Sequence, residues 1–171
     1  MTEFDEIIKT RRSIRHYTNK EVEEEKIEKI LKAGMQAPGS RLKEEPWEFL
    51  VIRDKNILGQ LGEVKPRVAN CNVAIVLLAN MERNHYKEVW QQDMSAAAEN
   101  MLLEACNQDI GGLWNGVAPI PERMQKISEI LELPGHINVF CILSFGYPDG
   151  EENHYMDKFD QKRIHYEKYN K

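Results

Sequence analysis

The segment Lys9-Thr10-Arg11-Arg12-Ser13-Ile14-Arg15-His16-Tyr17 concentrates positive charge near the start of an otherwise acidic sequence. Three guanidinium groups and one hydroxyl fall within the five residues from Arg11 to Arg15. Guanidinium forks match phosphate oxygens in bidentate fashion, and a serine hydroxyl can add a neutral donor to the same group. The segment therefore predicts a phosphate-binding site. The alternative is a solvated basic turn, because charged runs usually lie at the surface.

The composition indicates one soluble domain spanning residues 1–171. The chain has 23 basic and 28 acidic residues, and the resulting net charge of −5 argues against a nucleic-acid partner. No apolar run approaches the length of a membrane span, and residues 1–6 are acidic where a signal peptide would be basic. We therefore expect a cytoplasmic protein with no membrane partner.

Cysteine and histidine spacing gives no sign of a metal site. The three cysteines are odd in number and have no CxxC spacing, so we interpret Cys71, Cys106 and Cys141 as buried thiols in a reducing compartment. The histidines share no ligand spacing with cysteines or carboxylates. The sequence also lacks a GxSxG elbow, a GxxxxGK[ST] loop, an HExxH motif and a GxGxxG motif after a strand. We expect no metal site.

Apolar periodicity predicts helices that alternate with short strands, as in an α+β fold. We expect helices at Thr2–Lys9, Glu21–Ala37, His85–Gln108 and Pro121–Leu131, with a brief helical turn at Ile57–Leu61. The long helix from His85 should be central, because Ala96, Ala97 and Ala98 would let a neighbour approach closely. The last segment, Asp149–Lys171, has no apolar core of its own, so it is either loose or wraps over a neighbouring subunit.

Dense β-branched and aromatic runs predict the strands. We expect mostly buried strands at Trp47–Ile52, Val73–Ala79 and Ile137–Phe145. Gly111–Gly116 should be a strand or an extended turn, with glycines that allow close backbone approach.

The ordered set of motifs resembles the nitroreductase family of flavin enzymes. Arg11 to Tyr17 is similar to its RRSxRxF/Y opening, and four further matches follow in order. They are Met35-Gln36-Ala37-Pro38 with Pro46-Trp47-Glu48-Phe49, Asp93 to Leu103, Gly111 to Pro119, and Gly146-Tyr147-Pro148. Together they span almost the whole chain.

The resemblance implies a central, mostly antiparallel sheet flanked by helices, in an intertwined homodimer with one FMN per active site built from both subunits. Arg11, Arg12, Ser13 and Arg15 would hold the FMN phosphate and ribityl chain. Pro38, Gly39 and Ser40 would reach the isoalloxazine from the partner. Further candidates for cofactor binding are Gly112, Leu113 and Trp114 along the ring, Lys158 and Arg163 in a tail (149–171) closing over the phosphate, and, more weakly, Arg67 beside the flavin.

Two of these assignments have structural alternatives. Trp114 could be a core aromatic, and Lys158 and Arg163 could belong to a solvated tail. The sequence also departs from the family pattern between Ala37 and Trp47, where the usual asparagine and glutamine are missing and one extra residue is present. Ser40 or Arg41 could replace the lost amide. Only Met81–Glu88 precedes the long helix where relatives insert a lid, so the site should be open.

The activity that the resemblance implies is reduction of nitroaromatics, quinones or similar small acceptors by NADH or NADPH, in a ping-pong mechanism with the flavin carrying the chemistry. Three alternatives stay open at this point. The protein could store or sense flavin without turnover, it could run another flavin reaction such as enone reduction or reductive dehalogenation, or its arginines could bind a different phosphate in a ligand-binding dimer.

Overall fold

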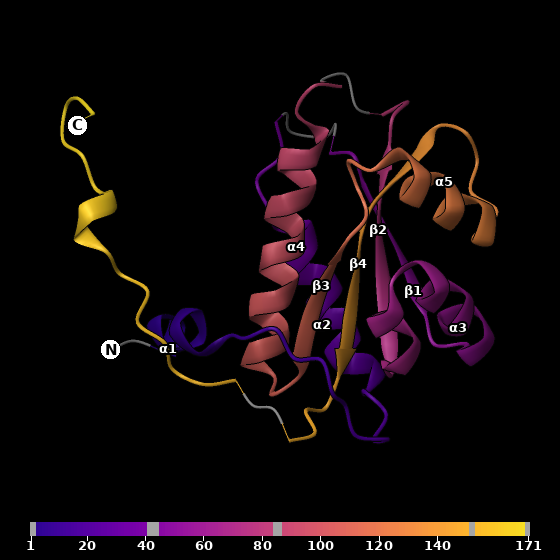
Figure 1. Ribbon diagram of the computed structural model, residues 1–171, viewed down its shortest axis with the longest axis horizontal. Coiled ribbons are helices and arrows are strands. Elements are labelled where there is room, and N and C mark those ends of the chain that lie inside the picture. Colours follow the sequence, from indigo (N-terminus) through magenta and orange to yellow (C-terminus); the bar gives the residue numbers. More distant parts are fainter. Residues whose placement is uncertain (1–2, 41–44, 84–86, 151–152, 170–171) are drawn as a thin grey trace.

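The computed structural model describes residues 3–40, 45–83, 87–150 and 153–169. Four strands form one sheet, and helices cover both of its faces (Figure 1). The α-helices within this part of the chain are α1 (Glu3–Thr10), α2 (Glu24–Met35), α3 (Lys55–Val64), α4 (Trp90–Asn107) and α5 (Pro121–Ile130), and the 3₁₀ helices are η1 (Pro66–Asn70) and η2 (Gln161–Arg163).

The sheet has the strand order β1-β2-β4-β3, and each neighbouring pair is antiparallel. The strands are β1 (Trp47–Ile52), β2 (Val73–Asn80), β3 (Gly111–Gly116) and β4 (Ile137–Gly146). In the outer pair, Gly112 lies opposite Phe145. The predicted antiparallel sheet and the α+β class are confirmed.

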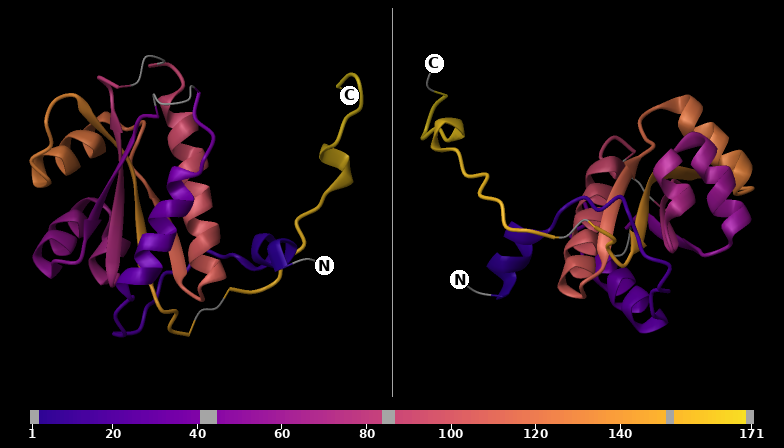
Figure 2. Two further views of the ribbon diagram at one scale, coloured as in Figure 1. Left: turned by 180° about the vertical axis from the view of Figure 1, so that it is seen from behind. Right: turned by 60° about the horizontal axis from the view of Figure 1, so that its bottom comes forward.

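The central strands are buried on both faces, so their side chains alternate between two cores. On β2, Val73, Ile75 and Leu77 pack towards α2 and α4. Ala74 and Val76 pack on the opposite side with α3, η1 and α5. The view from behind in Figure 2 shows α2 and α4 together on one face. The near-continuous apolar run of β2 is what this double covering requires.

Several expected boundaries differ from the structure. The helix expected from Glu21 begins at Glu24, because Val22 is buried in the core and Glu23 has an extended backbone, with φ −62° and ψ 143°. The long helix begins at Trp90; His85 lies outside the described residues, and residues 87–89 form turns.

The helical turn predicted at Ile57–Leu61 is shorter than the helix that the structure shows there. The Asp54 side chain accepts hydrogen bonds from the backbone N–H groups of Asn56 and Ile57, so a complete helix, α3, begins at Lys55. The 3₁₀ helix η1 was not predicted. Strand β1 is an edge strand of the sheet in which only Ile52 is buried, so the expectation of a mostly buried strand was wrong.

Burial of the cysteines agrees with the prediction at two of three positions. Cys71 and Cys141 are buried, whereas Cys106 is half-buried on α4, and all three are free thiols. Burial raises the pKa of each thiol, most strongly at Cys141. The thiolate, which is the reactive form, is therefore disfavoured at all three positions.

The chain after β4 leaves the body and forms an extended arm, here residues 153–169 (Figures 1 and 2). The arm passes the end of α1 and then extends away from the sheet, with η2 as its helical turn. Its large apolar side chains are exposed, Phe159 to 73%. The arm has no core within the chain, as expected for this segment.

Candidate functional site

The arginine segment runs beside the first residues of β3. Ser13 forms a parallel β-bridge with Gly112, and the Ile14 amide donates to the Gly112 carbonyl at 3.0 Å. Ile14 is 1% exposed, so this side chain anchors the segment in the core. Two sequence-predicted sets of site residues, Arg11–Arg15 and Gly112–Trp114, are therefore brought together.

Glycines at the start of β3 make this approach possible. A Cβ at Gly111 would lie 2.8 Å from the Ile14 Cβ, and one at Gly112 would lie 2.8 Å from Leu102 Cδ2. A side chain at either position would collide with a packed neighbour. The glycines thus set how closely the arginine segment lies against the sheet.

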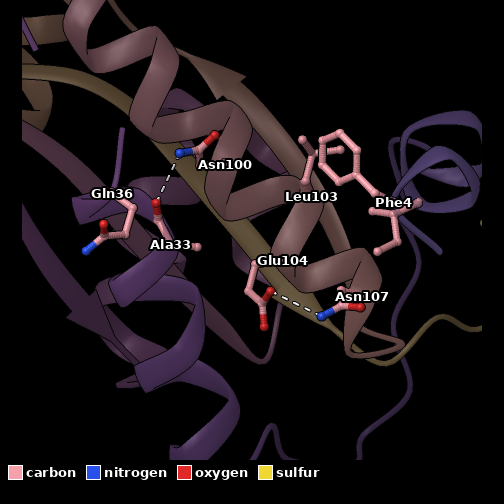
Figure 3. A pocket seen from close by; sticks show the side chains of 8 residues that line it. Phe4, Ala33, Gln36, Asn100, Leu103, Glu104 and Asn107 are labelled. Atoms are coloured by element: carbon pink, nitrogen blue, oxygen red, sulfur yellow. Dashed lines mark hydrogen bonds between the residues drawn. The ribbon is translucent and has the colours of Figure 1, made fainter. Parts of the chain in front are cut away.

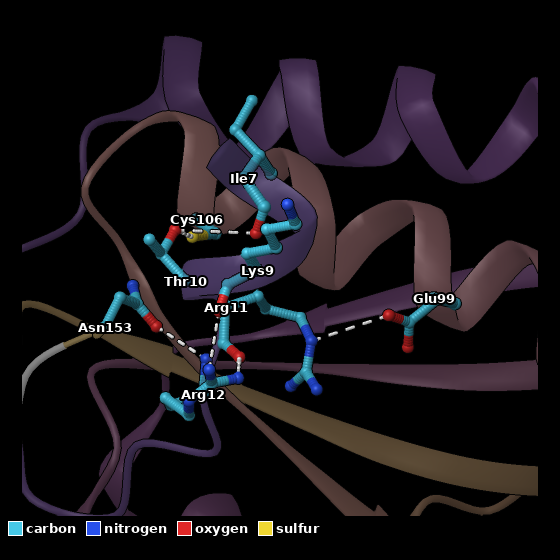
Figure 4. Close-up of polar contacts among 8 residues, drawn as sticks. All are labelled: Ile7, Lys9, Thr10, Arg11, Arg12, Glu99, Cys106 and Asn153. Atoms are coloured by element: carbon cyan, nitrogen blue, oxygen red, sulfur yellow. Dashed lines mark hydrogen bonds and ion pairs between the residues drawn. The ribbon is translucent and has the colours of Figure 1, made fainter. Parts of the chain in front are cut away.

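The arginine side chains turn to different partners (Figure 4). Arg11 pairs with Glu99 of α4 across 3.5 Å. The Arg12 guanidinium donates to the carbonyls of Arg11 and Lys9 at the end of α1, which lack partners within the helix. Arg15 donates to the Ser13 carbonyl at 3.0 Å. The segment is held by α1, α4 and β3 at once.

Arg12 gives the test of whether a phosphorylated cofactor fits here. Its Nε is buried and has no hydrogen-bond partner within the described chain. A buried donor without an acceptor costs about 1–3 kcal/mol, more when it is charged. An anionic oxygen placed beside Arg12 would remove that cost, so the residues present suit a phosphate group.

The projecting arm starts beside the same segment. The Asn153 side-chain oxygen accepts from the Arg12 amide at 2.9 Å, and the Met156 amide donates to the Lys9 carbonyl at 3.0 Å. Arg163 is the last residue of η2, where its side chain is 85% exposed and paired with Asp160. A single chain therefore does not bring Arg163 to the arginine segment, and Lys158 is an exposed residue of the same arm.

Pro38, Gly39 and Ser40 lie after α2, beside the first turn of α4. Ser40 donates to the Asp93 carboxylate at 2.8 Å, while Arg11 contacts Glu99 six residues later on the same helix. Six residues correspond to roughly 9 Å along the helix and to a rotation of about 120° around it. The two predicted sets thus lie on different sides of α4. Arg41 falls outside the described residues.

Leu113 is buried and Trp114 is half-buried within β3. The Trp114 ring meets the Phe140 ring edge-on, with 5.6 Å between centroids. Trp114 therefore packs partly into the core, in line with the alternative that it is a core aromatic, and part of its side chain stays accessible. Arg67 lies on η1, which packs with α3 on the face of the sheet opposite α4.

Comparison with known proteins decides the family. The sequence model of the nitroreductase family matches residues 8–69 and 65–147. The chain belongs to the nitroreductase family. A nitroreductase relative in Archaeoglobus fulgidus, provisionally named an NADH dehydrogenase/NAD(P)H nitroreductase, is 43% identical over 99% of this chain and 100% of its own.

Two solved structures are similar over nearly their whole length. A Clostridium acetobutylicum protein, provisionally named an NADH oxidase, is 48% identical with a TM-score of 0.92, over 95% of this chain and 99% of its own. An FMN-dependent nitroreductase of Clostridium difficile is 36% identical with a TM-score of 0.88, over 96% of this chain and 99% of its own. Relatives of this nitroreductase-family chain are thus named as oxidoreductases.

Sequence reasoning missed one cluster that supports the site of this nitroreductase-family member. The Tyr147 hydroxyl donates to Glu23 at 2.6 Å, and Lys20 Nζ lies 3.7 Å from the Tyr147 ring centroid. The hydrogen bond from Tyr147 lowers the pKa of the Glu23 carboxyl to about 2, helped by the nearby lysines. Tyr147 also accepts the Thr18 amide through its carbonyl, which fixes the far end of the arginine segment.

A second missed feature is a cavity of about 320 Å³ beside α4 (Figure 3). Its walls come from α1, the end of α2 and the outer face of α4, and they include Phe4, Ile7, Asn100, Leu103 and Asn107. Phe4 is 63% exposed although it is a large apolar residue. The outer face of α4 is therefore an accessible, largely apolar surface of the nitroreductase-family fold.

Two absences can be stated for the residues that the structure describes. No group of three or more potential ligands for a metal ion occurs among the residues that the structure describes. Within the same residues, no helix is both long and apolar enough to cross a membrane.

Proposed function

We propose that this chain is an FMN-dependent oxidoreductase that uses NADH or NADPH to reduce nitroaromatics, quinones or similar small acceptors. Family membership and the FMN-dependent relative at 36% identity support this proposal. The observation that carries it is the arginine segment beside Gly112, with the buried Arg12 Nε in need of an acceptor. FMN ends in a phosphate that would supply one.

In this proposal Arg11, Arg12, Ser13 and Arg15 hold the phosphate and ribityl chain. Gly112, Leu113 and Trp114 line the flavin ring, since β3 leads directly away from the bridge at Ser13. Pro38, Gly39 and Ser40 would come from the other subunit, because within one chain they lie on a different side of α4. Lys158 and Arg163 would close over the phosphate through the arm.

We also propose that the protein is a homodimer. The arm leaves the body with its apolar side chains exposed, and the outer face of α4 offers a cavity walled by Phe4 and Leu103. Burying such surfaces against a second copy would be favourable. The nicotinamide nucleotides and the free thiols fit a cytoplasmic location.

Bound FMN would supply hydride acceptance and hydride donation at its ring. The chain would contribute affinity, orientation and charge: the arginines fix one end of the cofactor, and the Trp114 side of β3 limits water on one face. A nicotinamide nucleotide would give up its hydride and leave, and the acceptor would then occupy the same space. Because the segment before α4 is short in sequence, the site would admit acceptors of varied shape.

The test is anaerobic stopped-flow absorbance of the protein loaded with FMN. We expect NADH or NADPH to bleach the visible absorption band of the bound flavin. A nitroaromatic or quinone added afterwards should restore it. If neither nucleotide bleaches the band, the proposed activity is wrong.

A further inference from the structure

A hydrogen bond joins the loop after α2 to the first turn of α4. Ser40 Oγ donates to Asp93 Oδ1 at 2.8 Å. Asp93 is 7% exposed, whereas Ser40 is exposed. The pair therefore has one buried end and one end open to a ligand.

This bond determines what Ser40 can offer to a ligand. A carboxylate only accepts hydrogen bonds, so the single hydroxyl proton of Ser40 is committed to Asp93. The exposed side of the hydroxyl then presents lone pairs alone. The negative charge on Asp93 lies in the first turn of α4, where the helix dipole favours it.

We propose that Asp93 is a positioning residue that fixes the Ser40 hydroxyl as a hydrogen-bond acceptor for a donor group of the FMN that the partner subunit holds. This inference rests on the proposed function. Residues 37–47 lack the asparagine and glutamine that the family pattern places there, and with them an amide oxygen that could accept. A serine that donates its hydroxyl proton in a hydrogen bond to a buried carboxylate also presents an oxygen that can only accept, and it does so with a shorter side chain.

The donor on FMN belongs to one of two groups, the imide N–H of the ring or a hydroxyl of the ribityl chain. Both present an N–H or O–H to an acceptor, so the chemistry at Ser40 is the same. Lumiflavin, which keeps the ring but lacks the ribityl chain, separates them. A Ser40 effect that persists with lumiflavin assigns the ring, and one that appears only with riboflavin or FMN assigns the chain.

The experiment measures the Kd of FMN for the full-length apoprotein by quenching of flavin fluorescence. We expect Ser40→Ala to raise the Kd about fivefold, the loss of one ordinary hydrogen bond. Asp93→Asn, which is isosteric, should also raise the Kd because its amide can donate to Ser40 and release the hydroxyl proton. In the Ser40→Ala background, Asp93→Asn should have no further effect.

Two controls separate positioning from folding. Ser40→Thr keeps the hydroxyl and should keep most of the affinity. Ser95→Ala removes a hydroxyl of the same helix that is bonded to the Gln91 carbonyl at 2.6 Å, and should leave the Kd unchanged. An unchanged Kd in Ser40→Ala, or effects of Ser40→Ala and Asp93→Asn that simply add, would overturn the inference while the wild-type protein still binds FMN. A wild-type protein that binds no FMN would overturn the proposed function as well.

Discussion

At the residue scale, Arg12 links local structure to ligand affinity. Its guanidinium closes the end of α1 through two carbonyls and leaves Nε buried without an acceptor in the described chain. Arg11 instead faces Glu99 and is already paired. The two neighbouring arginines therefore have different roles in the chain before any ligand binds.

Replacing either arginine should weaken retention of FMN. We expect Arg11→Ala and Arg12→Ala each to cost about 1.5–3 kcal/mol of binding free energy, the range for a hydrogen bond to a charged group. Equilibrium dialysis against FMN measures the change. Arg123→Ala on α5 is the matched control and should bind FMN as the unchanged protein does. Normal retention in both Arg11 and Arg12 variants would place the phosphate elsewhere.

Tyr147 should make stability depend on pH in the acidic range. The pKa of Glu23 is about 2 in the folded protein and 4.5 ordinarily, so its contribution is fully present above 4.5 and is lost as the pH falls towards 2. Tyr147→Phe removes the largest cause of that shift. We expect this variant to be less stable than the unchanged protein above pH 4.5 and the difference to shrink as the pH approaches 2.

Urea unfolding at a series of pH values measures the effect of Tyr147→Phe. In a Glu23→Gln background the carboxyl is absent, so Tyr147→Phe should give the same difference at each pH. A difference of constant size in the natural background would show that Glu23 is not the titrating partner.

At the element scale, α3 offers two glycines with opposite surroundings. A Cβ at Gly62 would lie 2.6 Å from the Cβ of Ala69 on η1, whereas one at Gly59 would meet nothing within 4 Å. We expect Gly59→Ala to stabilise the protein by about 0.5–1 kcal/mol, since alanine favours helix over glycine. We expect Gly62→Ala to destabilise it by about 1–3 kcal/mol, because α3 and η1 must move apart.

Thermal and urea unfolding of the two α3 variants give the measurement, and each variant is the control for the other. If both variants changed the free energy of unfolding by the same amount and in the same direction, α3 and η1 would not pack as closely as the structure shows.

The elements that sequence predicted well are those in which one physical cause dominates. Val73 to Ala79 is uniformly apolar because both faces of β2 are covered, and its short length and β-branched residues favour a strand over a buried helix. Helix ends were harder to predict. Val22 fits the apolar period of α2 and is buried, yet α2 begins only after Glu23, whose backbone is extended. Glu23 is bonded to Tyr147, and these two residues come together only after folding.

The candidate site was predictable in part for the same reason. The arginine motif and the Gly111-Gly112 pair are local signals, and the fold brings them together through the bridge at Ser13. The Ser40 and Asp93 contact joins residues 53 positions apart, so neither residue alone indicated it. Whether Lys158 and Arg163 reach a phosphate depends on a second copy of the chain and stays a prediction.

At the scale of the whole molecule, the exposed arm and the outer face of α4 predict self-association. We expect a particle of twice the 19.9 kDa chain mass in light scattering. Leu103→Asp places a charge in the wall of the apolar cavity and should shift the particle towards the single chain and reduce FMN retention. Gln60→Asp adds the same charge on the exposed side of α3 and should change neither. A single-chain mass for the unchanged protein would contradict the homodimer.

The burial of Ile14 restricts how the segment from Arg11 to Tyr17 can change in length. Successive side chains of an extended chain point to opposite sides, so with Ile14 directed into the core, Ser13 and Arg15 both point away from it. If one residue were inserted or deleted between Arg12 and Ile14, the chain could not both keep Ile14 buried in the core and keep Arg11 and Arg12 in their present positions. Active variants of the protein should therefore carry substitutions in this segment more often than insertions or deletions.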